Sequence, residues 1–170
     1  MMQILRYLLV ILAFMATPLH ATSDEIMLDM IAWIEKNSKY KYNGEKLPWI
    51  EIRTQEEICA VLFEEPPENC IALAYYDHNL NAIFLSPDPI GRMVQEKFIE
   101  VIIFHELVHF LQYTNGEDEF VLCENALELD AYKLQDKYVE EMGWPDEQRP
   151  NMLFAYLVSS CRQDHFSNER

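Results

Sequence analysis

Basic side chains are scarce in this sequence of 170 residues. Lysine and arginine together number 13 against 29 aspartates and glutamates, so the formal net charge at pH 7 is −16. A surface of this sign repels nucleic acids and anionic membranes, and neither is expected as a partner. Glycine is also rare, with four residues, and no internal repeat or low-complexity tract is visible. With 50% hydrophobic residues, a chain of this length is expected to fold as one domain.

No apolar run near the N-terminus is long enough to cross a bilayer. Residues 7–16 are apolar and follow Arg6, but a membrane-spanning helix needs about 20 residues. Small residues follow at Ala21, Thr22 and Ser23. This arrangement predicts a secretory signal peptide over residues 1–21 and a periplasmic or secreted domain over residues 22–170, without a stable membrane anchor after cleavage. The alternative is an uncleaved anchor, because Arg6 alone makes a thin basic region.

The sequence contains no C-x-x-C pair among its four cysteines. An even number of cysteines in an oxidising compartment indicates two disulfides, for which three connectivities are possible. We expect Cys59–Cys70, which would close a short loop, and Cys123–Cys161, which would tie the C-terminal segment to the region of the site. The alternative, in which the cysteines bind zinc, is disfavoured by their spacing.

Hydrophobic spacing and turn residues predict both helices and strands. Helices are expected from Ser23, over residues 54–63 behind a capping box, over 92–114, from Glu117 to the glycine at 143, and over 150–163. Strands are expected over residues 49–53, 70–76 and 82–86, the last two as a hairpin. The predicted class is α+β, with a small antiparallel or mixed sheet packed on a central helix and a second helix that carries a glutamate.

The segment over residues 101–112 holds the pattern His105-Glu106-Leu-Val-His109 inside an apolar helix. Four residues advance a helix by slightly more than one turn, so the two imidazoles share a face and can reach one metal ion at about 2.0–2.1 Å. Glu106 lies one position round the helix, where it is not placed to be a ligand. The pattern predicts a zinc site that is also a hydrolytic centre. The alternative is a core helix without a metal.

A catalytic zinc takes three protein ligands and keeps one position open. The third ligand is expected from a second helix packed across the first. Glu128, which borders the apolar stripe of that helix, is the best candidate, and Glu124, one turn earlier on the same face, is its rival. The Ala131-Tyr132 context favours Glu128 over Glu124.

The motif His105-Glu-Leu-Val-His109, followed by Glu128-Leu-Asp-Ala-Tyr132, resembles the gluzincin zinc metallopeptidases over roughly residues 70–135. The resemblance implies a zincin-like fold with one Zn²⁺ per chain, held by both histidines and Glu128. It also implies that Glu106 is the general base of peptide-bond hydrolysis, with a peptide or protein as substrate. By analogy, the strand over residues 83–85 would border the cleft and pair with an extended substrate, unless it is internal to the sheet.

Zincins usually add a donor for the developing oxyanion. Tyr132 and His165 are the preferred residues, and His78 is a weaker third. Gln112 and Asp130 are expected to support the ligands or to face solvent rather than to touch the substrate. The rival to the peptidase is a zincin scaffold that keeps a structural zinc and serves as a binding or accessory protein. Glu106 favours the enzyme, because a purely structural site would not need it.

Overall fold

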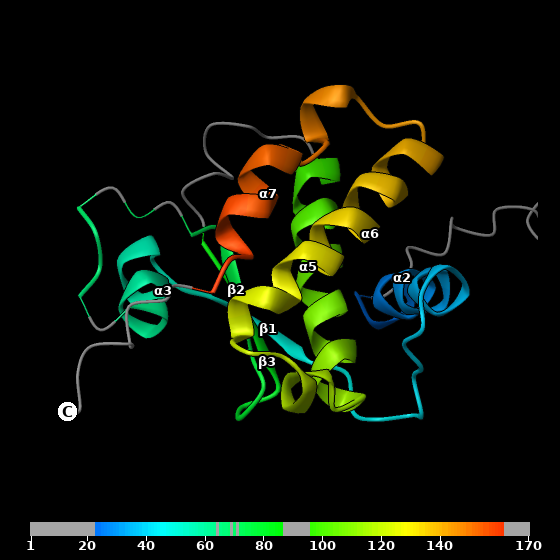
Figure 1. The fold of residues 1–170 in the computed structure, drawn as a ribbon. Helices are drawn as coiled ribbons and strands as arrows, with labels where there is room; N and C mark the ends of the chain where they lie inside the picture. The colour runs from blue at the N-terminus through cyan, green and yellow to red at the C-terminus, as the bar shows by residue number, and fades with distance from the viewer. Residues whose placement is uncertain (1–22, 64, 69, 71, 87–95, 162–170) are drawn as a thin grey trace, which may run out of the picture.

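The computed structural model describes residues 23–63, 65–68, 70, 72–86 and 96–161 (Figure 1). The predicted signal peptide and His165 lie outside these residues. The described part is α+β, as the sequence predicted. Its helices are α2 (Ser23–Asn37), α3 (Gln55–Leu62), α5 (Glu96–Thr114), α6 (Glu128–Glu141) and α7 (Met152–Val158), and its strands are β1 (Trp49–Ile52), β2 (Ala74–Asp77) and β3 (Ala82–Leu85).

The three strands form a mixed sheet in the order β1-β3-β2. The predicted hairpin is confirmed, since β2 pairs antiparallel with β3 and the Asp77 carboxylate accepts hydrogen bonds from the amides of Asn79 and Leu80 in its turn. Strand β1 lies parallel to β3 on the other side. The strand expected to pair with substrate, residues 83–85, is therefore internal to the sheet. That expectation was wrong, because both edges of β3 are already hydrogen-bonded.

Helix α5 forms the centre of the core and contacts α2, α6 and β2 (Figure 1). Phe104, Leu107 and Leu111 have no solvent exposure. The Phe104 ring stacks on Tyr138 of α6 at a centroid distance of 4.1 Å, and its edge meets Trp33 of α2. Apolar side chains on several faces of α5 are buried in this way, and the polar side chains among them are therefore held in fixed surroundings.

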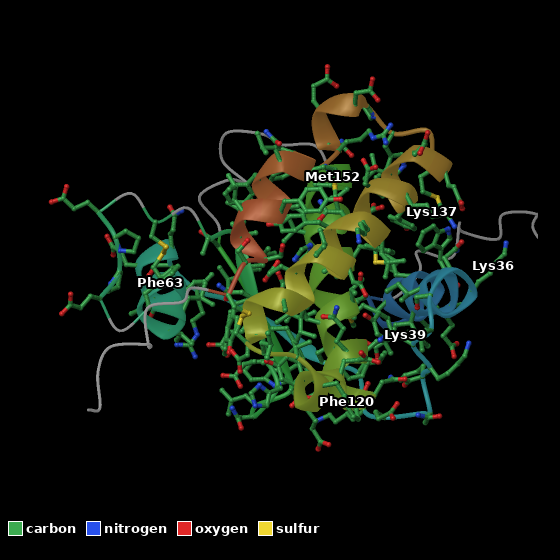
Figure 2. The ribbon with its side chains drawn as sticks, in the orientation of Figure 1. Lys36, Lys39, Phe63, Phe120, Lys137 and Met152 are labelled. Atoms are coloured by element: carbon green, nitrogen blue, oxygen red, sulfur yellow. A yellow bond between two sulfur atoms is a disulfide. The ribbon has the colours of Figure 1, made fainter. Side chains whose placement is uncertain are left out.

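The segment before α6 differs from the prediction of one helix starting at Glu117. A 3-10 turn covers Glu117–Phe120, Val121 and Cys123 are extended, a second 3-10 turn covers Glu124–Leu127, and α6 begins at Glu128. Phe120, which was expected on the apolar stripe, is 82% exposed and lies at the edge of the molecule (Figure 2). The periodicity was misleading here because it reflects neighbouring residues alone, whereas Cys123, directly ahead of the second 3-10 turn, is also bonded to the distant Cys161.

Both expected disulfides are present, Cys59–Cys70 and Cys123–Cys161. The first ties α3 to the segment ahead of β2, which begins at Ala74 rather than Cys70. The second ties the end of α7 to the segment ahead of α6, and α7 ends at Val158, earlier than predicted. Two disulfides fit a protein that folds in an oxidising compartment.

None of the helices in the described segments is both long and apolar enough to cross a membrane.

We predict that two phenylalanines of this chain differ sharply in their effect on stability. Phe104→Ala should lower the free energy of unfolding by about 3–5 kcal/mol, because it opens a cavity in the core. Phe120→Ala should change it by less than about 0.5 kcal/mol, because that ring is in solvent. Urea unfolding followed by circular dichroism measures both. If both variants lose the same free energy of unfolding, Phe120 is not in solvent and the extended segment before α6 is contradicted.

Candidate metal centre

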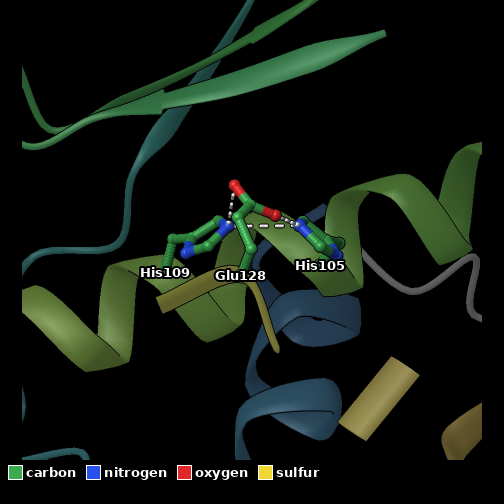
Figure 3. Close-up of side chains that lie close together, drawn as sticks. All are labelled: His105, His109 and Glu128. Carbon is green, nitrogen blue, oxygen red and sulfur yellow. Dashed lines mark hydrogen bonds and ion pairs between the residues drawn. The ribbon is translucent and has the colours of Figure 1, made fainter. Parts of the chain in front are cut away.

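Three predicted ligands meet where α5 and α6 cross (Figure 3). His105 and His109 lie one turn apart on α5, and their Nε2 atoms are 3.1 Å from each other. Glu128, the first residue of α6, places one carboxylate oxygen 3.1 Å from the Nε2 atom of His105 and the other 3.4 Å from that of His109. The side chains are 11%, 12% and 31% exposed, in the order His105, His109, Glu128.

The other ring nitrogen of each histidine is held by an amide. His109 Nδ1 lies 2.7 Å from Gln112 Oε1, and His105 Nδ1 lies 2.9 Å from Gln135 Oε1. The Gln112 amide can be oriented in one way only, because its Nε2 group donates to the Leu127 carbonyl and to the Tyr40 hydroxyl. An amide oxygen accepts, so each histidine donates its Nδ1–H to its glutamine, and the Nε2 atom of the neutral ring carries the lone pair.

These contacts bring two nitrogen lone pairs and a carboxylate to one point. Atoms that only accept hydrogen bonds repel one another at such distances unless a cation or a proton lies between them. Zinc bonds of 2.0–2.1 Å in a tetrahedral arrangement place neighbouring ligand atoms about 3.3 Å apart. The observed separations of 3.1, 3.1 and 3.4 Å fit that spacing. The donor set therefore suits a single zinc ion with an open fourth position.

The charges of the site also favour a bound cation. Burial alone would lower the pKa of His109, but the Glu128 carboxylate outweighs it and raises that pKa to about 9. Burial alone would raise the pKa of Glu128, but His109 and His105 hold it well below its usual range. Positive charge among the three groups is therefore favoured, either as a proton on His109 or as a metal ion that displaces this proton.

Glu106 lies beside this group without joining it. Its side chain is buried, with 6% of the residue exposed, and burial raises the pKa of its carboxyl against the opposing effect of His105 and His109. The amide of Tyr76, on β2, donates a hydrogen bond to the carboxylate. Glu106 therefore has a fixed position next to the three ligands, as the sequence predicted.

The remaining predicted residues lie at varied distances from the centre. The Tyr132 ring centroid is 4.5 Å from that of His105, and burial, followed by Glu128 and Glu106, raises the pKa of its hydroxyl above the usual value. Tyr132 therefore stays protonated and able to donate. His165 is outside the described residues, so its predicted role is not placed.

Glu124, the rival ligand, does not join the group of three. It accepts a hydrogen bond from the Tyr113 hydroxyl, and His78 stacks on that same ring at 4.4 Å. Asp130 accepts a hydrogen bond from Tyr40. Through Tyr40 and Gln112 it is linked to His109. Asp130 was expected either to support a ligand or to face solvent, and this chain of hydrogen bonds fits the first alternative.

Two supporting residues were missed in the sequence. Gln135 lies seven positions after Glu128, two turns along the same face of α6, and that spacing was a signal that could have been used. Tyr40 lies in the segment after α2 and reaches the site only through the tertiary fold. No local pattern marks it.

We predict that Gln135→Leu weakens zinc binding roughly 10- to 100-fold, because His105 loses the acceptor that orients its ring. Leucine and glutamine have similar helix propensities, so α6 should be unaffected. Lys133→Leu, at an exposed position of the same helix, is the matched control and should bind zinc like the wild type. Competition with a chromophoric chelator measures both affinities. Wild-type affinity in Gln135→Leu would show that the amide does not orient the ligand.

Comparison with protein-family models matches residues 20–167 to the family described as "Domain of unknown function (DUF6647)". No curated protein and no solved structure gave a significant match. The matched region covers most of the chain and includes all three residues of the metal centre. The chain therefore belongs to the DUF6647 family.

Proposed function

We propose that this protein is a zinc-dependent peptidase with a zincin-like fold of the gluzincin type. The observation that carries the proposal is the position of Glu106. This buried carboxylate lies beside the three ligands and lines the same pocket as His105 and Glu128, yet it is not itself one of the group. A structural metal site has no use for a free carboxylate there, whereas hydrolysis requires a base next to the attacking water.

His105, His109 and Glu128 would hold the metal. A zinc ion bound there lowers the pKa of a coordinated water and polarises a carbonyl group. Glu106 accepts a proton from the attacking water at its carboxylate and then donates that proton to the leaving amine. The Tyr76 amide and the buried surroundings keep this carboxylate in place during both transfers.

Tyr132 is the proposed donor to the oxyanion. It lines the pocket next to the ligands, and its raised pKa keeps the hydroxyl protonated throughout the neutral range. A neutral donor aimed at developing negative charge stabilises the transition state more than the ground state.

The outward-facing backbone groups at one edge of the sheet support a peptide as the substrate. Strand β2 is the edge strand on the side of α5, and residues 72–74 line the pocket. The Leu73 carbonyl accepts a hydrogen bond from the Ser86 amide, so Leu73 faces β3. Backbone groups alternate along an antiparallel strand, and those of Ala72 and Ala74 therefore face away from β3. An extended peptide can pair with such an edge.

We predict that Glu106→Gln binds one zinc per chain but cleaves peptides at least about 100-fold more slowly, because the amide cannot accept the proton. Glu124→Gln is the matched control. It changes a nearby glutamate that bonds to Tyr113, and it should keep both zinc and turnover. Cleavage of a peptide library by zinc-loaded protein, read by mass spectrometry, measures the rates.

Two results would contradict the proposed function. One is a wild-type protein that carries zinc and cleaves no peptide, as expected of the binding or accessory protein. The other is a Glu106→Gln variant that cleaves at the wild-type rate.

A further inference from the structure

Two of the three ligands, His105 and Glu128, line a pocket with a volume of about 980 Å³. Its walls are largely apolar and come from segments far apart in the sequence. Leu62 and Phe63, at the end of α3, form one wall, and Phe154, Leu157 and Val158 of α7 form another. Residues 72–74, at the start of β2, line the same pocket, and Phe63 is labelled in Figure 2.

The helices that form these walls are not part of the segment that carries the zinc motif. Helices α3 and α7 lie outside residues 70–135, over which the chain resembles gluzincins. Each is fixed by a disulfide, and Cys70 and Cys161 both line the pocket. The apolar surface is therefore held next to the metal centre by covalent bonds.

Large apolar side chains remain in solvent along this pocket. Leu157 is 67% exposed, Phe154 is 45%, Phe63 is 44% and Leu62 is 38%. Covering such surface with an apolar group is favourable in proportion to the area removed from water. The ionisable groups among the described lining residues are His105, Glu106, Glu128 and Tyr132, with no lysine or arginine. An acidic side chain would find no cation there except the metal.

We propose that this pocket binds a large apolar side chain of the peptide, next to the bond that is cleaved. This inference rests on the proposed function and specifies its substrate class. Substrates carry leucine, phenylalanine or a similar residue beside the scissile bond, and peptides with aspartate or glutamate at that position are poor substrates. Helix α7 provides the discrimination, and the metal centre provides the chemistry.

The test uses zinc-loaded full-length protein and peptide hydroxamates, which bind zinc and are not cleaved. Three hydroxamates differ only in the side chain next to the hydroxamate group, which is that of leucine, glycine or aspartate. Calorimetry should give an affinity for the leucine compound at least about tenfold above the other two, in line with the discrimination of apolar pockets.

Two leucines of α7 supply a matched pair of variants. Leu157 lines the pocket, whereas Leu153, with a similar exposure of 70%, does not. Leu157→Asp should lose about tenfold in affinity for the leucine hydroxamate, while Leu153→Asp should keep the wild-type affinity. Leu157→Ala, a milder change, should lose less, and circular dichroism checks that all variants fold.

The outcomes separate this inference from the proposed function. Equal affinity for all three hydroxamates, no binding of any, or equal losses for the two leucine variants would overturn the apolar pocket. Side-chain preference with the expected losses supports it, even if the library shows no cleavage. If the preference is found without cleavage, the proposed peptidase activity would be wrong, and the pocket would be a binding site for apolar peptide side chains.

Discussion

The Nε2 atoms of two imidazoles and the oxygens of a carboxylate converge within 3.4 Å between α5 and α6. In a largely buried place this arrangement is unfavourable unless positive charge lies among the three groups. Much of the surrounding structure can be understood as holding them there. Amide oxygens fix both rings from behind, and Gln112 also bonds to the Leu127 carbonyl, directly ahead of Glu128. A single glutamine thus joins the ligand on α5 to the start of α6.

The position of Glu128 depends on helix packing, on a disulfide and on the helix dipole. Helix α6 packs on α5, with the Phe104–Tyr138 stack and the buried Ala131 in the core that the two helices share. The Cys123–Cys161 disulfide ties down the chain five residues ahead of Glu128, and α6 begins at this glutamate. A carboxylate at a helix N-terminus is also favoured by the helix dipole. The ligand is therefore held by packing on one side and by a covalent bond on the other.

Local features of the sequence predicted those parts of the protein that depend on local spacing. The i, i+4 histidines, the capping box at Thr54 and the hairpin at Asp77 follow from neighbouring residues, and the structure has the last two as expected. The pairing of the cysteines was also predicted correctly. Features that depend on distant partners were missed: Tyr40 reaches Gln112 across the fold, and the apolar spacing around Phe120 predicted a helix although the expected disulfide of Cys123 already tied that segment to a distant one.

The direct measurement of the central claim is the metal content of the purified full-length protein. Elemental analysis should find one zinc per chain in the wild type after mild reconstitution, and little or none in His105→Ala, which removes one of the three ligands. Circular dichroism must show that the variant remains folded. A wild type without zinc, or a folded His105→Ala variant that keeps its full complement, would contradict the account.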